Sequence, residues 1–392
     1  MNKLFDNTEI AFASKSNTEL KKTFLLFKII ANPLLVKLGT NVVNFLLRMH
    51  LPIKGIIKST IFKQFCGGTT VHECETIIKN LSSSNISSIL DYSVEGKISE
   101  VDFERAAAKK CELIMLASKN RHISFVAMKP TALGRFALWE KITANDSLSD
   151  KEEEEWRNIQ RRIQQICHKA YEQDVPVLID AEESWMQDAA DELVEEMMKL
   201  YNKESVIVYN TIQCYRWDRL QYVKHLKEKA VKSNFLIGTK LVRGAYMEKE
   251  NLRAMEMGRK SPICESKEAT DSMFNDVLTY VLDNLDVFSL FVGSHNEEST
   301  YLAIELMKSK GLANHHKQIW FGQLYGMSEQ ITYNLAAKGY NATKLIPFGP
   351  IREVIPYLTR RAQENTSVAG QSNRELSLLQ QEMKRRNIRL LF

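Results

Sequence analysis

Several features that would point to common protein classes are missing from this chain. Its six cysteines form no Cys-x-x-Cys pair and have no metal-ligand spacing, so we expect reduced, mostly buried thiols and no metal site. The net charge is only +5, from 53 basic and 48 acidic residues. No basic stripe with interleaved aromatic residues occurs, so we expect no nucleic-acid surface.

The first residues carry no targeting pattern. Met1 to Leu20 lacks both the apolar core of a signal peptide and an Arg-rich transit pattern, so we expect a cytoplasmic location. The stretch from Phe24 to Leu47 is apolar, but Lys28 and Lys37 interrupt it, and charges at bilayer depth are unfavourable. We therefore expect a helical cap or a surface that touches lipid or a partner, rather than a membrane span.

From residue 86 onward, short β-branched runs alternate with amphipathic stretches, which is typical of a parallel sheet with crossover helices. The predicted strands are residues 88–92, 125–128, 175–180, 206–213, 236–242, 288–293, 319–324 and 343–347. The predicted helices are residues 101–120, 152–173, 185–201, 218–231, 265–285, 297–308, 328–338 and 351–365. Eight such pairs, with no GxGxxG turn, predict an α/β fold of the (β/α)8 TIM-like barrel type rather than an open doubly wound sheet.

The two ends of the chain do not follow this alternation. Residues 1–85 are predicted to be an accessory helical segment, residues 86–370 the barrel, and residues 371–392 a basic C-terminal tail. Such a tail is interpreted either as an ordinary final helix or as a contact with an anionic membrane.

Polar residues follow most of the predicted strands. Because the active sites of barrel enzymes lie at the C-terminal ends of the strands, we expect these side chains to converge. They are Lys129, Asp180, Gln213, Lys240, Arg243, Ser294, His295 and Gln323. Each residue alone is weak evidence, because a single Lys or His at a strand end is more often a surface or loop residue.

The last predicted barrel helix carries an arginine pair. Tyr357, Arg360, Arg361 and Glu364 have i, i+3, i+4, i+7 spacing and therefore share one helix face. Guanidinium groups bind carboxylates through paired hydrogen bonds. Arginines near a helix C-terminus can also simply stabilise the helix dipole.

The basic residues Lys129, Lys240, Arg243, Arg360 and Arg361 outnumber the acids expected beside them, chiefly Asp180 and Glu364. Buried charge of one sign requires a counter-charge, so this cluster predicts a small carboxylate and a phosphate-bearing cofactor as ligands. The sequence shows no metal-ligand set and no Ser-His-Asp order, which favours the chemistry of an organic cofactor.

Several segments of the chain resemble those of the proline dehydrogenase family, whose members are flavin enzymes built on a distorted (β/α)8 barrel. The matching segments lie in the family's order, from residue 86 to residue 366. They are Phe125 to Lys129, Asp180 to Glu183, Lys240 to Tyr246, Leu324 to Met327, Pro347 to Pro350 and Tyr357 to Asn365.

The resemblance implies a role for each matching site residue. It implies that the proline carboxylate is bound by Arg360, Arg361 and Lys129, and that the ring is enclosed by Tyr357, Tyr246, Ala245 and Leu324. It implies that Asp180 pairs with the basic groups and that Lys240 lies close to the reactive edge of the flavin. The implied FAD contacts are Ala181, Gln213, Lys240, Arg243, Gly244, Ala245, Ser294, His295 and Glu364.

The implied reaction is oxidation of L-proline to 1-pyrroline-5-carboxylate, the first step of proline catabolism, by hydride transfer from C5 to flavin N5. By resemblance, the electrons pass to a membrane quinone, with a peripheral contact on the inner face of the membrane. We expect no fused aldehyde dehydrogenase module, so that the product goes to a separate pyrroline-5-carboxylate dehydrogenase.

One departure leaves the substrate open. Many family members carry a Tyr where this chain has Leu345, so hydroxyproline or another cyclic amino acid is an alternative substrate. A different reaction class is a Schiff-base aldolase or isomerase that uses Lys129 or Lys240. A third reading is a catalytically silent protein that keeps a proline pocket.

Overall fold

The computed structural model of the chain describes residues 4–32, 34–36, 38–39, 54–93, 99–367 and 371–389. Within these ranges, the side chains of residues 54, 56, 362–367 and 371–372 are outside the description. The apolar stretch singled out at 24–47 therefore lies only partly within the described residues, and Leu390 to Phe392 of the predicted tail lie beyond them.

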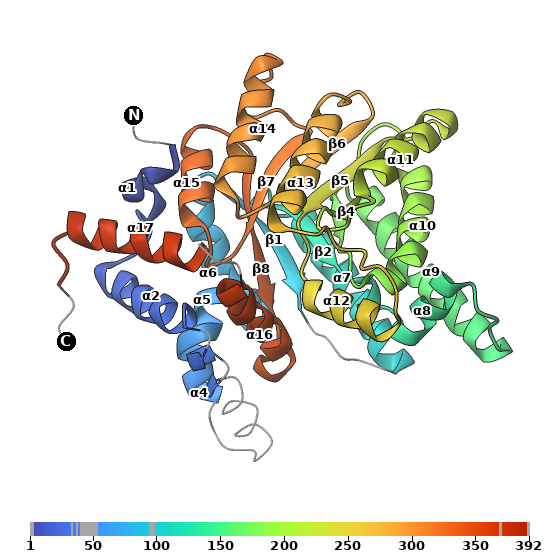
Figure 1. Ribbon diagram of the computed structural model, residues 1–392, viewed down its shortest axis with the longest axis horizontal. Coiled ribbons are helices and arrows are strands. Elements are labelled where there is room, and N and C mark those ends of the chain that lie inside the picture. Colours follow the sequence, from blue (N-terminus) through green and yellow to red (C-terminus); the bar gives the residue numbers. More distant parts are fainter. Residues whose placement is uncertain are drawn as a thin grey trace.

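Eight parallel strands close into a barrel in which neighbours in the ring are also neighbours in the chain (Figure 1). The strands are β1 (Ile86–Tyr92), β2 (Ile123–Met128), β3 (Val177–Ile179), β4 (Val208–Gln213), β5 (Ile237–Val242), β6 (Phe288–Gly293), β7 (Ile319–Leu324) and β8 (Ala342–Phe348). The ring closes where β1 pairs along its whole length with β8. The predicted α/β barrel is confirmed.

A helix follows each strand and lies outside the ring, close to the ranges predicted from periodicity (Figure 1). These helices are α7 (Glu100–Ser118), α9 (Asp150–Glu172), α10 (Ser184–Tyr201), α11 (Arg219–Ser233), α13 (Lys267–Leu282), α14 (Glu297–Ser309), α15 (Glu329–Ala337) and α16 (Ile351–Ser367). The second of these helices, α9, begins with a capping box between Ser149 and Glu152.

Strand β3 is shorter than predicted. The apolar run begins at Val175, but Pro176 has no N–H and offers only its carbonyl, which accepts from Val126. At the other end, the Asp180 N–H still donates to the Met128 carbonyl although the strand has ended. The backbone thus stays in register with β2 while the Asp180 side chain reaches the barrel mouth.

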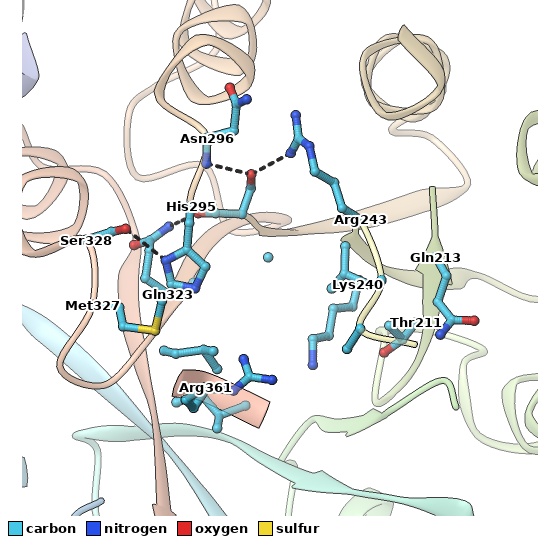
Figure 2. Close-up of a pocket in the computed structure, with 18 of the residues that line it drawn as sticks. Thr211, Gln213, Lys240, Arg243, His295, Asn296, Gln323, Met327, Ser328 and Arg361 are labelled. Carbon is cyan, nitrogen blue, oxygen red and sulfur yellow. Dashed lines mark hydrogen bonds between the residues drawn. The ribbon is translucent and has the colours of Figure 1, made fainter. Parts of the chain in front are cut away.

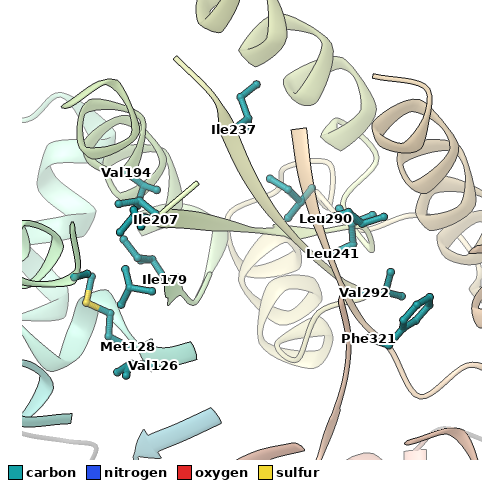
Figure 3. Close-up of a cluster of buried hydrophobic side chains, with 14 of the residues drawn as sticks. Val126, Met128, Ile179, Val194, Ile207, Ile237, Leu241, Leu290, Val292 and Phe321 are labelled. Carbon is teal, nitrogen blue, oxygen red and sulfur yellow. The ribbon is translucent and has the colours of Figure 1, made fainter. Parts of the chain in front are cut away.

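Side chains alternate between the two faces of the barrel wall. In β2, Val126 and Met128 pack against the helices, as Figure 3 shows, whereas Phe125 and Ala127 fill the barrel interior. In β5, Ile237 and Leu241 belong to the outer layer. Because alternate residues of a strand point to opposite faces, Lys240 then points inward.

Three helical segments between strands were not predicted. After β2, the short 3-10 turn η3 (Pro130–Ala132) and α8 (Phe136–Ala144) precede α9, and after β5, α12 (Met247–Glu256) precedes α13. All three follow strand ends whose polar residues were predicted to form the site. They therefore build the loops around the barrel mouth.

Helical segments precede and follow the barrel in the chain, and the C-terminal helix packs on the first two α-helices (Figure 1). They are η1 (Leu4–Asp6), α1 (Thr8–Ala11), α2 (Asn17–Ile30), α4 (Lys54–Ile57), the π-helical turn η2 (Lys58–Phe62), α5 (Lys63–Phe65), α6 (Val71–Ser82) and α17 (Gln371–Arg385). A second hydrophobic cluster joins Phe24 and Phe27 of α2, Leu379 of α17, and Tyr357 and Leu358 of α16. The helix with the arginine pair is thus held by both ends of the chain.

Candidate active site

A cavity of about 520 Å³ lies at the C-terminal ends of the strands and brings together residues from many parts of the chain. Its lining includes these residues predicted from the sequence: Lys129, Asp180, Ala181, Gln213, Lys240, Arg243, Gly244, Ala245, Tyr246, Ser294, His295, Leu324, Leu345, Tyr357, Arg360 and Arg361. The Glu364 side chain lies outside the described residues. The roles given to these residues stay predictions.

A short charged contact at the cavity joins Lys240 of β5 to Asp180, which follows β3. The Lys240 Nζ donates to Asp180 Oδ1 at 2.6 Å, and the two side chains are 9% and 20% exposed. Figure 2 shows the Lys240 and Arg361 side chains extending from opposite sides toward the same central space. The Lys240 nitrogen is therefore held in an ion pair at the edge of that space.

Helix α16 supplies Tyr357, Arg360 and Arg361 to the cavity wall. Arg361 is only 9% exposed, and its guanidinium carbon lies 5.1 Å from the centre of the Tyr357 ring. A guanidinium stacked on an aromatic ring is held in one orientation by packing, with its N–H edge still able to meet an anion. The i, i+4 spacing predicted from the sequence produces this stack.

Arg243 ties the ends of two strands together. Its guanidinium donates to Asp271 at 2.7 Å and to the hydroxyls of Ser294 and Ser299 at 2.9 Å each. The guanidinium carbon also lies 4.6 Å from the centre of the Phe274 ring. Arg243 thus fixes the loop after β6 as well as lining the cavity.

His295, which follows β6, is held in its neutral form. Burial lowers the pKa of His295 to about 3, and the positive charges of Lys344, Arg361 and Arg243 act in the same direction. Its Nδ1 lies 2.9 Å from the Ser328 hydroxyl (Figure 2). At neutral pH the ring therefore presents a neutral imidazole edge to the cavity.

Buried polar atoms at the cavity that have no hydrogen-bond partner among the described residues include Thr211 Oγ1 and Gln213 Oε1. The Gln213 amide nitrogen is already used, because it donates to the Glu182 carbonyl at 2.9 Å. A buried acceptor without a donor is unfavourable, so a ligand with N–H groups would complete it. The flavin implied by the resemblance carries such a group, and the residues present fit it.

Gly244 has a backbone that favours glycine. Its φ is +130°, and a Cβ at this position would come 2.6 Å from the Tyr215 ring. The turn that carries Arg243, Ala245 and Tyr246 to the cavity needs this close approach. A side chain here would push the turn into the site or away from it.

Several lining residues were not predicted as site residues: Asp91, Thr211, Met327, Arg374 and Glu375. Asp91 and Thr211 lie near the C-terminal ends of β1 and β4, so a search for polar residues near strand ends could have identified them. Arg374 and Glu375 belong to α17, within the basic C-terminal tail that the sequence suggested as an ordinary final helix or a membrane contact. No local pattern places a terminal helix at the mouth of a barrel.

Helix α17 contributes charge to the cavity wall. Glu375 accepts the backbone N–H of Ser328, and burial raises the pKa of Glu375 to about 7. Arg374 bonds to Asp6 at 2.7 Å and to Glu297 at 2.9 Å. Acids lining the cavity therefore include Asp91, Glu297 and Glu375, and the excess of positive charge is smaller than the sequence suggested.

Comparisons with known proteins agree with one another. The family model described as proline dehydrogenase matches residues 74–374. The chain is 32% identical to proline dehydrogenase 1, mitochondrial, of Dictyostelium discoideum, over 98% of this chain and 75% of that protein. It is 33% identical to the carbapenem antibiotics biosynthesis protein CarD of Pectobacterium carotovorum, over 85% of this chain and 86% of that protein.

Among solved structures, the chain superposes on proline utilization A of Bdellovibrio bacteriovorus inactivated by N-propargylglycine, with a TM-score of 0.71 and 22% identity. The match covers 92% of this chain but only 38% of that one, so the chain spans well under half of the larger protein. At this identity the superposition supports the fold.

We predict that Asp180→Asn destabilises the protein by about 2–3 kcal/mol, because the Lys240 ammonium loses its charged partner in a poorly hydrated place. Urea unfolding would measure the loss. The matched control is Asp283→Asn, which breaks the more exposed pair with Lys310 and should change stability by less than about 1 kcal/mol. If both variants lost the same stability, the view that Lys240 and Asp180 form a poorly hydrated ion pair would be contradicted.

Proposed function

This chain belongs to the proline dehydrogenase family, and we infer that it oxidises L-proline to 1-pyrroline-5-carboxylate with FAD as the cofactor. The observation that carries this proposal is the meeting of Lys129, Arg360 and Arg361 at one cavity, beside the Lys240–Asp180 ion pair. A second, separate dehydrogenase then takes the 1-pyrroline-5-carboxylate as its substrate.

The substrate is held by its carboxylate. Arg360 and Arg361 offer planar N–H edges and Lys129 a compact ammonium, which together match a carboxylate better than either type alone. Tyr357, Tyr246, Ala245 and Leu324 enclose the ring of the amino acid. Anchoring one end of a small cyclic substrate leaves its reacting carbon in a defined position against the cofactor.

Bound FAD supplies the oxidant for removing two electrons from the amino acid. Gln213 Oε1 and Thr211 Oγ1, both without partners among the described residues, are the acceptors that would meet its N–H and O–H groups. Ala181, Arg243, Gly244, Ser294 and His295 line the remaining wall. The chain's part is to bind and orient both reactants and to exclude water from the space between them.

Schiff-base chemistry through Lys240 has less support at this site. The Lys240 nitrogen is engaged by Asp180 at 2.6 Å, whereas a Schiff-base lysine needs a free amine. A colourless protein that is trapped by borohydride with a keto substrate would favour that class. A flavin that proline does not bleach would favour the catalytically silent reading.

We predict that the purified protein is yellow, that anaerobic proline bleaches it, and that Arg361→Met raises KM for proline while the protein stays yellow. Loss of one charge-assisted contact to the carboxylate should remove about 2 kcal/mol or more of binding, roughly thirtyfold in KM. Arg352→Met is the matched control, since Arg352 is an exposed arginine of the same helix. A near-normal KM for Arg361→Met would refute the carboxylate contact.

A hydroxyproline or other ring-substituted substrate is the second candidate, because Leu345 lines the cavity and is 9% exposed. A leucine offers no hydroxyl to discriminate ring substituents. We predict that Leu345→Tyr raises the kcat/KM ratio of proline to 4-hydroxyproline by about tenfold, the effect of roughly 1.4 kcal/mol. An unchanged ratio would show that this position does not set the ring preference.

Electrons from the reduced cofactor pass to a membrane quinone, which requires the protein to reach a membrane. Among the described residues, no helix has the length and apolar character to cross a bilayer. A peripheral contact is therefore proposed. The relatives from Dictyostelium and several other eukaryotes carry the word mitochondrial in their names.

The surface that suits this contact is the outer face of α2 and the residues after it. Between Glu19 and Glu73 the sequence has eight basic residues and no acidic one. Ile29, Leu34 and Leu38 are 51%, 77% and 62% exposed. Exposed apolar side chains among lysines bind the interface of an anionic bilayer.

The basic C-terminal tail is less suited to that role. Arg385 is bonded to Glu382 and Glu9. Arg386 is bonded to Glu382 and donates to the Phe12 and Lys15 carbonyls. These guanidinium groups hold α17 on the N-terminal helices, so their charge is already met by carboxylates and carbonyls of the protein.

We predict that the protein floats with vesicles containing phosphatidylglycerol and not with pure phosphatidylcholine vesicles. The double variant Leu25→Glu, Ile29→Glu should lose flotation and quinone turnover in vesicles, yet keep proline oxidation with a soluble dye. Leu200→Glu with Val231→Glu, at sites elsewhere that are at least as exposed, is the matched control. If the control lost flotation while the Leu25→Glu, Ile29→Glu variant kept it, the assignment of this face to the membrane contact would be contradicted.

A further inference from the structure

Behind the cavity, Glu182 is bound through both carboxylate oxygens to one residue, Thr131. The Thr131 N–H donates to Oε2 at 3.0 Å and its hydroxyl to Oε1 at 2.7 Å. Glu182 is 5% exposed and does not line the cavity. We propose that Glu182 is a positioning residue of the substrate site, which acts on Lys129 through Thr131.

The Glu182 backbone is fixed independently of its side chain. Its N–H donates to Gln187 Oε1 at 2.8 Å, and its carbonyl accepts from Gln213 Nε2 at 2.9 Å. Gln187 is itself held by Asp191 at 2.8 Å. Glu182 is therefore anchored to α10 and to the end of β4, and it can serve as a rigid support.

Thr131 transmits that support to Lys129. It lies in the turn η3, which begins directly after Lys129 and closes with a bond from the Ala132 N–H to the Lys129 carbonyl at 3.1 Å. A lysine at the junction of a strand and a short turn changes its position when the turn moves. Holding Thr131 by two bonds thus fixes the point from which the Lys129 side chain extends.

This inference rests on the proposed function, in which Lys129 is one of the cations that bind the substrate carboxylate. The charge on Glu182 adds a second effect, because an anion near Lys129 opposes a bound carboxylate. Burial raises the pKa of Glu182 to about 7, and the nearby Glu183 adds to this, while Lys129 and the Thr131 bonds act the other way. Tyr246 also faces this pair, and Arg360 acts on Tyr246 in turn.

The sign of the pH effect follows from linkage. A substrate carboxylate beside Glu182 favours the protonated form of Glu182, so the protonated form must bind that carboxylate more tightly. Relative to a neutral residue of the same shape, Glu182 should therefore weaken proline binding above neutral pH and have no effect below it.

Two substitutions separate position from charge. Glu182→Ala removes both bonds to Thr131, and we expect KM for proline to rise about tenfold while kcat falls by less than about threefold. Glu182→Gln keeps both bonds, because its carbonyl accepts from the N–H and its amide can donate to the hydroxyl oxygen. Its KM for proline should therefore be close to the wild-type value and well below that of the alanine variant.

The pH profile distinguishes this role from a purely structural one. The ratio of wild-type to Glu182→Gln KM should be near one at about pH 6 and rise to roughly three at about pH 8.5. Other titrating groups cancel in this ratio because both proteins contain them. A ratio that stays flat, or that falls with pH, would overturn the charge effect.

Glu183→Gln is the matched control, since Glu183 is the adjacent buried acid but pairs with Lys249 instead of Thr131. It should change KM far less than Glu182→Ala does, because it leaves both bonds to Thr131 in place. If Glu182→Ala does not fold, Thr131→Val removes only the hydroxyl bond and should raise KM by about threefold. A normal KM in either soluble variant would overturn the proposal, whereas a wild-type protein that proline does not bleach would refute the proposed function instead.

Discussion

Positive charge collected in a poorly hydrated place is the constraint on which the rest of this structure depends. Buried cations are tolerated only when counter-charges are built in or brought by a ligand. Here Lys240 meets Asp180, Arg243 meets Asp271, and Arg374 meets both Asp6 and Glu297. Each pair joins different elements, so neutralising the charge also fixes the strand ends and the terminal helices.

The ends of the chain take part in the site through packing. The second hydrophobic cluster joins α2 and α17 to α16, and it contains Tyr357 and Met327, both of which line the cavity. The orientation of the arginine pair is therefore set by residues that lie outside the barrel itself. The same α2 turns its other face to solvent, which links the proposed membrane contact to the wall of the site.

Periodicity and strand-end chemistry predicted much of the fold. The eight strands and the helix after each were found because alternation and 3.6-residue spacing are local properties. Helices α8 and α12 were not predicted, because short helices in loops have little periodicity of their own. Strand β3 began late because Pro176 cannot donate to the ladder, a backbone effect that a hydrophobic count overlooks.

By itself, the sequence determined the barrel, the inward direction of residues such as Lys240, and the family of the chain. Only the tertiary structure decided that Arg374 and Glu375 reach the cavity, and that Glu182 holds Thr131 instead of facing the ligand. These contacts join residues far apart in the chain, and no local pattern encodes a distance between them. The ring closure that brings β8 beside β1 is what makes such distant residues neighbours.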